Sequence, residues 1–100
     1  MIVSHYISNP LTIDGLKFDL RIYVAITNLN PLRIYMHEEG LVRFATEIYE
    51  PPENSSKTGL NQFIHLTNYS INKQNLGWFK ENLDDGDGKN GSKWSIKSLR

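Results

Sequence analysis

The chain has 100 residues, of which 39% are apolar and 11% aromatic, which is the size of one small domain. Its 11 basic and 11 acidic residues cancel, so the charge indicates no surface for nucleic acid or anionic lipid. The absence of cysteine excludes disulfides, thiolate nucleophiles and cysteine-ligated metals. No apolar run approaches the ~18 residues that span a bilayer, and no signal peptide is evident. We therefore expect a soluble, intracellular protein.

Residues 17–27 alternate strictly between apolar and polar side chains. The apolar members are Phe18, Leu20, Ile22, Val24 and Ile26. This period of two predicts a strand with one face on a core and one polar face. Two more strands are expected at 32–37 and 41–46, after turns at 28–31 and 38–40, where Gly40 can take a positive φ. The short connections predict an antiparallel meander.

The remaining segments give weaker signals. A further strand is expected at residues 2–7, before the breakers at 9–10 and 14–15. Residues 65–73 suit a loop held by side-chain hydrogen bonds, and 74–91 suit a variable polar loop. Ser92 is the expected N-cap of a helix that begins near Lys93. The predicted fold class is α+β, and its sheet needs further elements, outside this sequence, to cover the apolar face.

Lys17, Asp19 and Arg21 form the first candidate site, because alternate residues of a strand point the same way. One interpretation is a solvated outer face with cross-strand ion pairs, each contributing roughly 0–1 kcal/mol. The other is a floor for an anionic ligand, with arginine and lysine binding carboxylate or phosphate. Arg43, two strands further along the predicted meander, is expected to converge with Arg21 from a non-adjacent strand.

The second candidate is the loop from His65 to Ser70, in which five of six side chains are polar without a regular period. Either it satisfies its own backbone or it faces a ligand. His5, His37 and His65 lack the spacing of zinc ligands and are expected to be structural. No metal ligand is predicted in this sequence.

Four stretches together resemble the tubulin–tyrosine ligase-like family, most closely its glutamylase branch. They are ISNPLTIDGLKFDLRIYV, PLRIYMHEEGLVRFATEIY, NQFIHLTNYSINK and GSKWSIKSL, in family order and over nearly the whole chain. The resemblance implies the antiparallel part of an ATP-grasp-like catalytic domain. It implies an enzyme that uses ATP to phosphorylate a glutamate side chain of tubulin, which the amino group of free L-glutamate then attacks to form an isopeptide bond.

The resemblance also assigns roles to individual residues. It places Lys17, Phe18, Asp19, Thr67, Asn68 and His65 at the nucleotide, with Phe18 contributing its backbone and His65 the least certain of these. It places Arg43, Tyr69, Ser70 and Lys93 at L-glutamate. Arg21 corresponds to the catalytic arginine that stabilises the acyl phosphate and the tetrahedral intermediate. In relatives the Mg²⁺ ligands and phosphate-binding lysines lie outside the matching stretch, so this fragment alone is expected to be inactive.

Three alternatives remain open at this point: a glycylase, a tyrosine ligase, or a non-catalytic microtubule-binding module. Arg43 and Lys93 together favour glutamate, because a second carboxylate calls for a second cation, whereas glycine needs only one. The expected partners are the acidic tails of tubulin and L-glutamate, with neither nucleic acid nor membrane. The expected location is cytoplasmic and cytoskeletal, with cilia, flagella and basal bodies as candidate sites.

Overall fold

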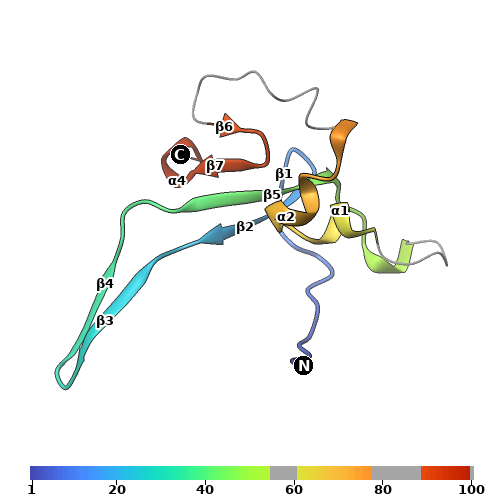
Figure 1. Ribbon diagram of the computed structural model, residues 1–100. Coiled ribbons are helices and arrows are strands. Elements are labelled where there is room, and N and C mark those ends of the chain that lie inside the picture. Colours follow the sequence, from blue (N-terminus) through green and yellow to red (C-terminus); the bar gives the residue numbers. More distant parts are fainter. Residues whose placement is uncertain (55–60, 78–88, 100) are drawn as a thin grey trace.

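The computed structural model describes residues 1–54, 61–77 and 89–99, which form an antiparallel five-stranded sheet, a two-stranded sheet and short helices (Figure 1). The five-stranded sheet has the order β1-β2-β5-β7-β6. Its strands are β1 (Thr12–Ile13), β2 (Leu16–Arg21), β5 (Leu41–Ile48), β7 (Lys93–Ser95) and β6 (Lys89–Asn90). The second sheet pairs β3 (Val24–Leu29) with β4 (Leu32–Met36). The helices are η1 (Pro52–Asn54), α1 (Gln62–His65), α2 (Tyr69–Asn72) and α4 (Ile96–Leu99). The predicted α+β class with antiparallel sheets is confirmed.

The predicted three-stranded meander is wrong, because β5 pairs with β2 and not with β4. After β2 the chain continues as β3, reverses direction in a turn and forms β4. It then pairs with β2 as β5, so that the four strands form one long, bent antiparallel ribbon. Its β3–β4 end projects away from the rest of the molecule (Figure 1). The segment 37–40 bends the returning strand without reversing it. Gly40 is needed there for space, since a Cβ at this position would lie 2.3 Å from the Arg21 carbonyl oxygen.

Of the alternation predicted for residues 17–27, the faces are confirmed over 17–21, where Phe18 contributes to the core of the five-stranded sheet. Leu20 and Ile22, which were also expected in the core, are each 45% exposed. Phe18 contacts Phe44 with ring centroids 5.9 Å apart, and Phe44 contacts Trp94 at 4.7 Å. Val42, Phe44 and Ala45 are the buried apolar residues of the described chain. The same pattern failed further along, because every residue of β3 and β4 is exposed. Val24, expected in the core, is 55% exposed.

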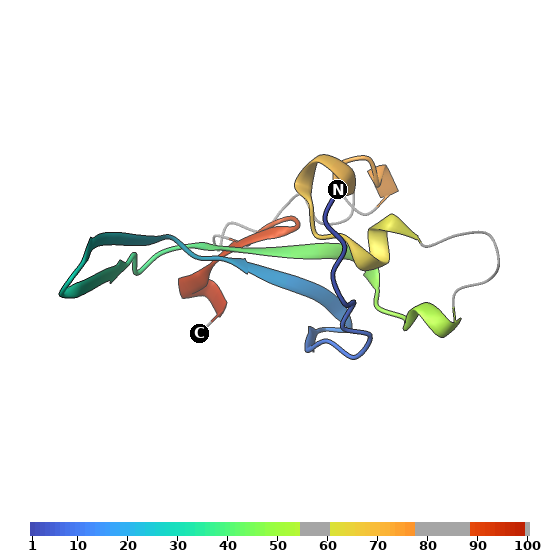
Figure 2. The same ribbon diagram turned by 90° about the horizontal axis from the view of Figure 1, so that it is seen from below.

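Helices α1 and α2 lie over one face of the five-stranded sheet, while α4 lies on the other side (Figure 2). The Asn61 side chain caps α1 by accepting a 2.9 Å hydrogen bond from the Phe63 amide. An irregularity in the β2–β5 pairing falls between Leu16 and Phe18. Opposite it, Thr46 of β5 is hydrogen-bonded to Asn72 of α2 through both its amide and its hydroxyl.

Three local predictions need correction. Residues 2–7 form no strand, since this segment joins no sheet of the described chain. The expected loop at 65–73 contains α2. Residues 93–95 form β7, so the last helix begins only at Ile96, and its capping hydroxyl belongs to Ser95, which accepts from the Ser98 amide at 3.1 Å.

Part of the predicted variable loop, residues 78–88, lies outside the described residues. The helices within the described ranges are all too short to cross a membrane.

Candidate functional site

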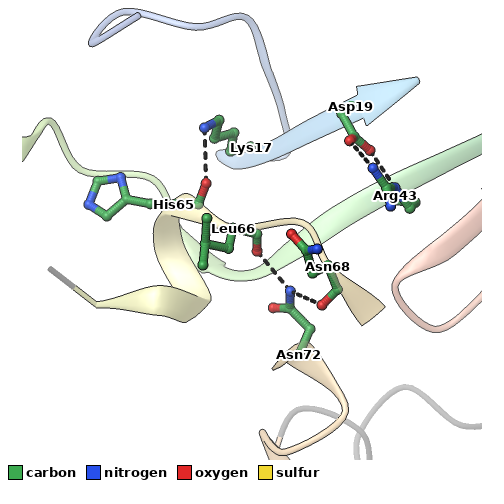
Figure 3. A network of polar contacts seen from close by, with 7 residues as sticks. All are labelled: Lys17, Asp19, Arg43, His65, Leu66, Asn68 and Asn72. Carbon is green, nitrogen blue, oxygen red and sulfur yellow. Dashed lines mark hydrogen bonds and ion pairs between the residues drawn. The ribbon is translucent and has the colours of Figure 1, made fainter. Parts of the chain in front are cut away.

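A row of three charged residues crosses the sheet face beneath α2. Arg43 of β5 lies directly opposite Asp19 of β2 on one side and Lys93 of β7 on the other. Directly paired residues of neighbouring strands project to the same face, so the three side chains share one surface. Arg43 binds Asp19 through both arms: its Nε donates to Oδ1 at 2.8 Å, and a terminal nitrogen donates to Oδ2 (Figure 3). The hydrogen bond with Asp19 raises the pKa of the Arg43 guanidinium, so this group is a permanent cation.

Lys93 joins the row to helix α2. Its ammonium lies 3.7 Å from the centroid of the Tyr69 ring, a distance at which a cation is attracted by the ring face. Tyr69 begins α2, directly after Asn68. Lys93 and Tyr69, two of the four residues that the resemblance places at the amino-acid substrate, therefore contact one another, although 24 positions separate them in the sequence.

The second pair of candidate residues, Lys17 and His65, also meets. The Lys17 ammonium donates a 2.9 Å hydrogen bond to the backbone carbonyl of His65 (Figure 3). It also lies 4.7 Å from the centroid of the Tyr6 ring. The Tyr6 hydroxyl in turn is 2.8 Å from Nδ1 of His65. Lys17 thus ties the start of β2 to the end of α1.

His65 is buried between two tyrosine rings, those of Tyr6 and Tyr49, each edge-on at 5.7 Å. Burial, and secondarily the charge of Lys17, lowers the pKa of His65. The same burial, with a hydrogen bond from Tyr6, raises the pKa of Tyr49 to about 12. Both groups are therefore neutral near pH 7.

Residues 66–68 run between α1 and α2, beside these groups. Thr67 is buried and Asn68 is exposed. Asn68 occupies the N-cap position of α2, yet its side chain makes no capping hydrogen bond. The backbone of this segment is instead held by Asn72, whose Nδ2 donates to the carbonyls of Leu66 and Asn68 at 2.7 and 3.0 Å (Figure 3). The side chain of Asn72 in α2 therefore holds the backbone of the 66–68 segment. The side-chain amide of Asn68 takes no part in holding it.

Asn72 is the residue that reasoning from the sequence missed. It is fully buried, although in the sequence it is one of several polar residues in a stretch without a regular period. The available signal was its place four residues after Asn68, since side chains four apart on a helix reach the preceding turn.

The structure thus brings together most of the residues that the sequence singled out. One group contains Lys17, Asp19, Arg43, Lys93, His65, Thr67, Asn68 and Tyr69. Phe18 turns its side chain to the opposite face, against Phe44. Ser70 is exposed on α2. Arg21 ends β2, exposed, and no residue of the described ranges gives its guanidinium a hydrogen bond or ion pair.

The expected convergence of Arg43 with Arg21 from a non-adjacent strand is wrong. Arg43 stands on the strand next to β2, and its partner is Asp19, two residues before Arg21. The cross-strand ion pair of the first interpretation is present between Asp19 and Arg43. Lys17 is bonded to the backbone carbonyl of His65, which a solvated outer face would not require. Binding of an anionic ligand at this face stays a prediction.

Chemically, three cations and one carboxylate on a partly covered surface suit the binding of anions such as carboxylates and phosphates. Within residues 1–54, 61–77 and 89–99, no group of three or more His, Cys, Asp or Glu could hold a metal ion.

Comparison of the chain with known proteins identifies its family. Tubulin polyglutamylase TTLL5 of Mus musculus is 48% identical over 99% of the chain, which spans 7% of that protein. Tubulin polyglutamylase TTLL7 of the same species is 43% identical over 100% of the chain and 11% of the protein. Tubulin monoglutamylase TTLL4, also from Mus musculus, is 48% identical over 99% of the chain and 8% of the protein. The model of the Tubulin-tyrosine ligase family matches residues 1–100. The chain belongs to the tubulin–tyrosine ligase family.

Proposed function

We propose that this chain is the nucleotide- and amino-acid-binding part of an ATP-dependent ligase of ATP-grasp fold that adds L-glutamate to glutamate side chains of tubulin. The observation that carries the proposal is the row of Asp19, Arg43 and Lys93 across three strands, with Lys93 against Tyr69. Two cations on one face suit the two carboxylates of glutamate. The names of the similar proteins, two polyglutamylases and one monoglutamylase, support the same donor.

The proposed reaction has two steps. An oxygen of the acceptor's γ-carboxylate attacks the γ-phosphorus of ATP, and ADP leaves. The amino nitrogen of glutamate then attacks the acyl carbon, the bond to the phosphate oxygen breaks, inorganic phosphate leaves, and the nitrogen loses a proton. Negative charge concentrates on the phosphate and on the tetrahedral carbon, so preorganised cations lower the barrier.

The residues divide between the substrates in the proposed mechanism. Lys17, Asp19 and the 65–68 segment, with Thr67 and Asn68, bind the nucleotide, and the backbone of Phe18 adds a contact. Arg43 and Lys93 bind the carboxylates of glutamate beside Tyr69 and Ser70. Arg21, at the exposed end of β2, stabilises the acyl phosphate and the tetrahedral intermediate.

Magnesium neutralises phosphate charge in such reactions. The described residues contain no cluster of side chains that could hold it. We propose that its ligands lie in other parts of the parent protein. The proposed partners are the acidic tails of tubulin, and the proposed location is the cytoskeleton, including cilia.

The decisive experiment varies the glutamate concentration with the full-length parent protein. Lys93→Ala leaves a carboxylate of the donor unpaired, which costs roughly 1–3 kcal/mol. We expect the KM for glutamate to rise about tenfold or more, since about 1.4 kcal/mol corresponds to a factor of ten. The KM for ATP should change little.

Lys97→Ala is the matched control, because it removes a nearby lysine whose ammonium is 3.2 Å from Glu39 and not in the row. A Lys93→Ala enzyme with the glutamate KM of the unmodified protein would contradict the assignment of Lys93 to the donor. A parent protein that incorporates glycine or tyrosine but not glutamate would contradict glutamate as the donor. A parent protein that incorporates no amino acid with ATP would leave a non-catalytic microtubule-binding module.

A further inference from the structure

Four hydrogen bonds converge on one buried side chain, that of Asn72, behind the segment 66–68. Its Oδ1 accepts from the amide and the hydroxyl of Thr46 at 3.1 and 2.9 Å. Its Nδ2 donates to the carbonyls of Leu66 and Asn68 at 2.7 and 3.0 Å. A primary amide can donate two hydrogen bonds and accept two. Every position of this side chain is therefore used.

The chemistry of the partners fixes the orientation of the amide. The backbone N–H of Thr46 needs an acceptor, so the atom facing β5 is the oxygen. The two backbone carbonyls of Leu66 and Asn68 need donors, so the atom facing the loop is the nitrogen. No other orientation satisfies all four groups, and a buried polar group left unpaired is costly.

Resting on the function proposed above, we propose that Asn72 is a positioning residue of the nucleotide site. It holds the backbone on both sides of Thr67 against the central strand β5, and so sets where Thr67 and Asn68 meet the nucleotide. Asn72 touches neither substrate in this role; it acts through the 66–68 segment. The backbone at Leu66 is extended, with φ,ψ of −108°,134°, so its carbonyl lies outside the helical hydrogen-bond pattern and takes its donor from Asn72. The Asn68 carbonyl accepts from the amides of Ile71 and Asn72 at 3.1 and 3.0 Å, and the Asn72 side chain gives it a further donor.

Asn72→Asp is the informative variant, because it changes one group and keeps the shape. The carboxylate still accepts both hydrogen bonds from Thr46, but it presents an oxygen to the two loop carbonyls in place of the donor. We expect the Kd for ATP of the full-length parent protein to rise about tenfold or more. Thr46→Val removes one of the four bonds and should give a smaller rise.

Asn75→Ala serves as the matched control. The Asn75 side chain donates to the Thr46 hydroxyl at 3.2 Å, in the same cluster, but it makes no hydrogen bond to residues 66–68. We expect this variant to bind ATP within about twofold of the unmodified protein.

Hydrogen exchange of the backbone amides, followed without nucleotide, supplies a readout that does not depend on the reaction. In Asn72→Asp the amides of residues 66–70 should exchange faster, while those of β2 and β5 stay protected. Unchanged exchange in 66–70 would overturn the proposal whatever the enzyme does. Faster exchange with an unchanged Kd for ATP would overturn the link to the nucleotide.

The outcome for the unmodified protein separates this proposal from the proposed function. A parent protein that does not bind ATP would overturn the proposed function and, with it, the nucleotide role of Asn72. A parent protein that binds ATP but transfers no glutamate would overturn only the proposed function, and a raised Kd in Asn72→Asp would still support the positioning role.

Discussion

Both carboxylate oxygens of Asp19 accept hydrogen bonds from Arg43. The Asp19 side chain is 39% exposed and the Arg43 side chain is 24% exposed. The resemblance assigns Asp19 to the nucleotide, but this geometry gives it a second task, which is to orient the guanidinium that is assigned to glutamate. Asp19→Asn keeps one acceptor and loses the charge. We therefore expect it to raise the KM for glutamate as well as that for ATP, by roughly 5- to 150-fold for a group costing about 1–3 kcal/mol.

Steady-state kinetics of the parent protein, with each substrate varied in turn, tests the double role of Asp19. Glu38→Gln is the control, because it removes an exposed acid that is outside the site. A change confined to the KM for ATP would contradict the second task.

His65 makes stability depend on pH. Its Nδ1 faces the Tyr6 hydroxyl, and its buried Nε2 has no hydrogen-bond partner among the described residues. The imidazolium carries two N–H groups, so its second N–H would find no acceptor. Burial, and secondarily the charge of Lys17, lowers the folded-state pKa of His65, while the unfolded chain keeps a value of about 6.5. Below that pH the unfolded state takes up a proton that the folded state does not, so stability falls as the pH falls.

Thermal unfolding of the parent protein between about pH 7.5 and pH 5.5 measures this dependence. His65→Gln should remove part of the loss of stability on acidification. His37→Gln, which replaces an exposed histidine, should not. Equal pH dependence in the His65→Gln variant and the unmodified protein would refute the role of His65. The Tyr49 hydroxyl stays neutral over this range, because its pKa is raised to about 12.

At the scale of the elements, Gly40 sits where β5 passes the end of β2. A Cβ there would lie 2.3 Å from the Arg21 carbonyl oxygen and 2.6 Å from the Ile96 side chain. This oxygen belongs to the backbone of β2, which pairs with β5 at Arg21 and Leu41, so it can shift less readily than a side chain. We expect Gly40→Ala to lower the free energy of unfolding of the parent protein by about 1–3 kcal/mol or more.

Gly77→Ala is the control for Gly40→Ala, because its Cβ would meet only the Asn75 side chain, at 3.9 Å. Denaturant unfolding of both variants gives the comparison. Equal stabilities would show that the close approach at Gly40 can relax.

The faces of β2 could be predicted from the sequence because alternation is local. Lys17 and Asp19 share one face and Phe18 the other, as the pattern indicates. The pairing of strands could not be predicted in the same way. Residues 49–92 separate β5 from β7 in the sequence. No local sequence pattern at either strand therefore predicts the pairing of Arg43 with Lys93. The contact of Asn72 with Thr46, 26 positions away, could not be predicted either, whereas its contact with the Asn68 carbonyl follows from local helical spacing.

The expectation for 2–7 failed because alternation or apolar character alone does not create a strand; a strand needs a partner with free backbone groups. Tyr6 instead contributes its ring and hydroxyl to Lys17 and His65. Ser92 and Ser95 are equally good capping residues by type. The strand pairing of Lys93 with Arg43, which no local pattern reveals, decided between them.

At the scale of the whole molecule, the buried apolar core is small for 100 residues. It consists of Val42, Phe44 and Ala45 among the described residues, while the β3–β4 hairpin exposes apolar side chains along its whole length. Contiguous exposed apolar surface of this kind is rare on stable monomers, and a two-stranded hairpin is marginal alone. The chain spans only 7% to 11% of the length of these relatives. We therefore expect the isolated 100-residue chain to be poorly soluble or only partly folded.

Ile26 and Ile34 provide the test, because they lie directly opposite one another on the hairpin and are 59% and 55% exposed. The double variant Ile26→Lys with Ile34→Glu replaces the apolar pair by an opposite-charge pair and leaves the net charge unchanged. If the parent protein covers the hairpin, the substitution should make the isolated chain more soluble while lowering the melting temperature of the parent, where two buried charges would be costly. An unchanged melting temperature of the parent would mean that the hairpin stays exposed there. A sharp, cooperative thermal transition of the unmodified isolated chain as a monomer would contradict the expectation that it needs such a cover.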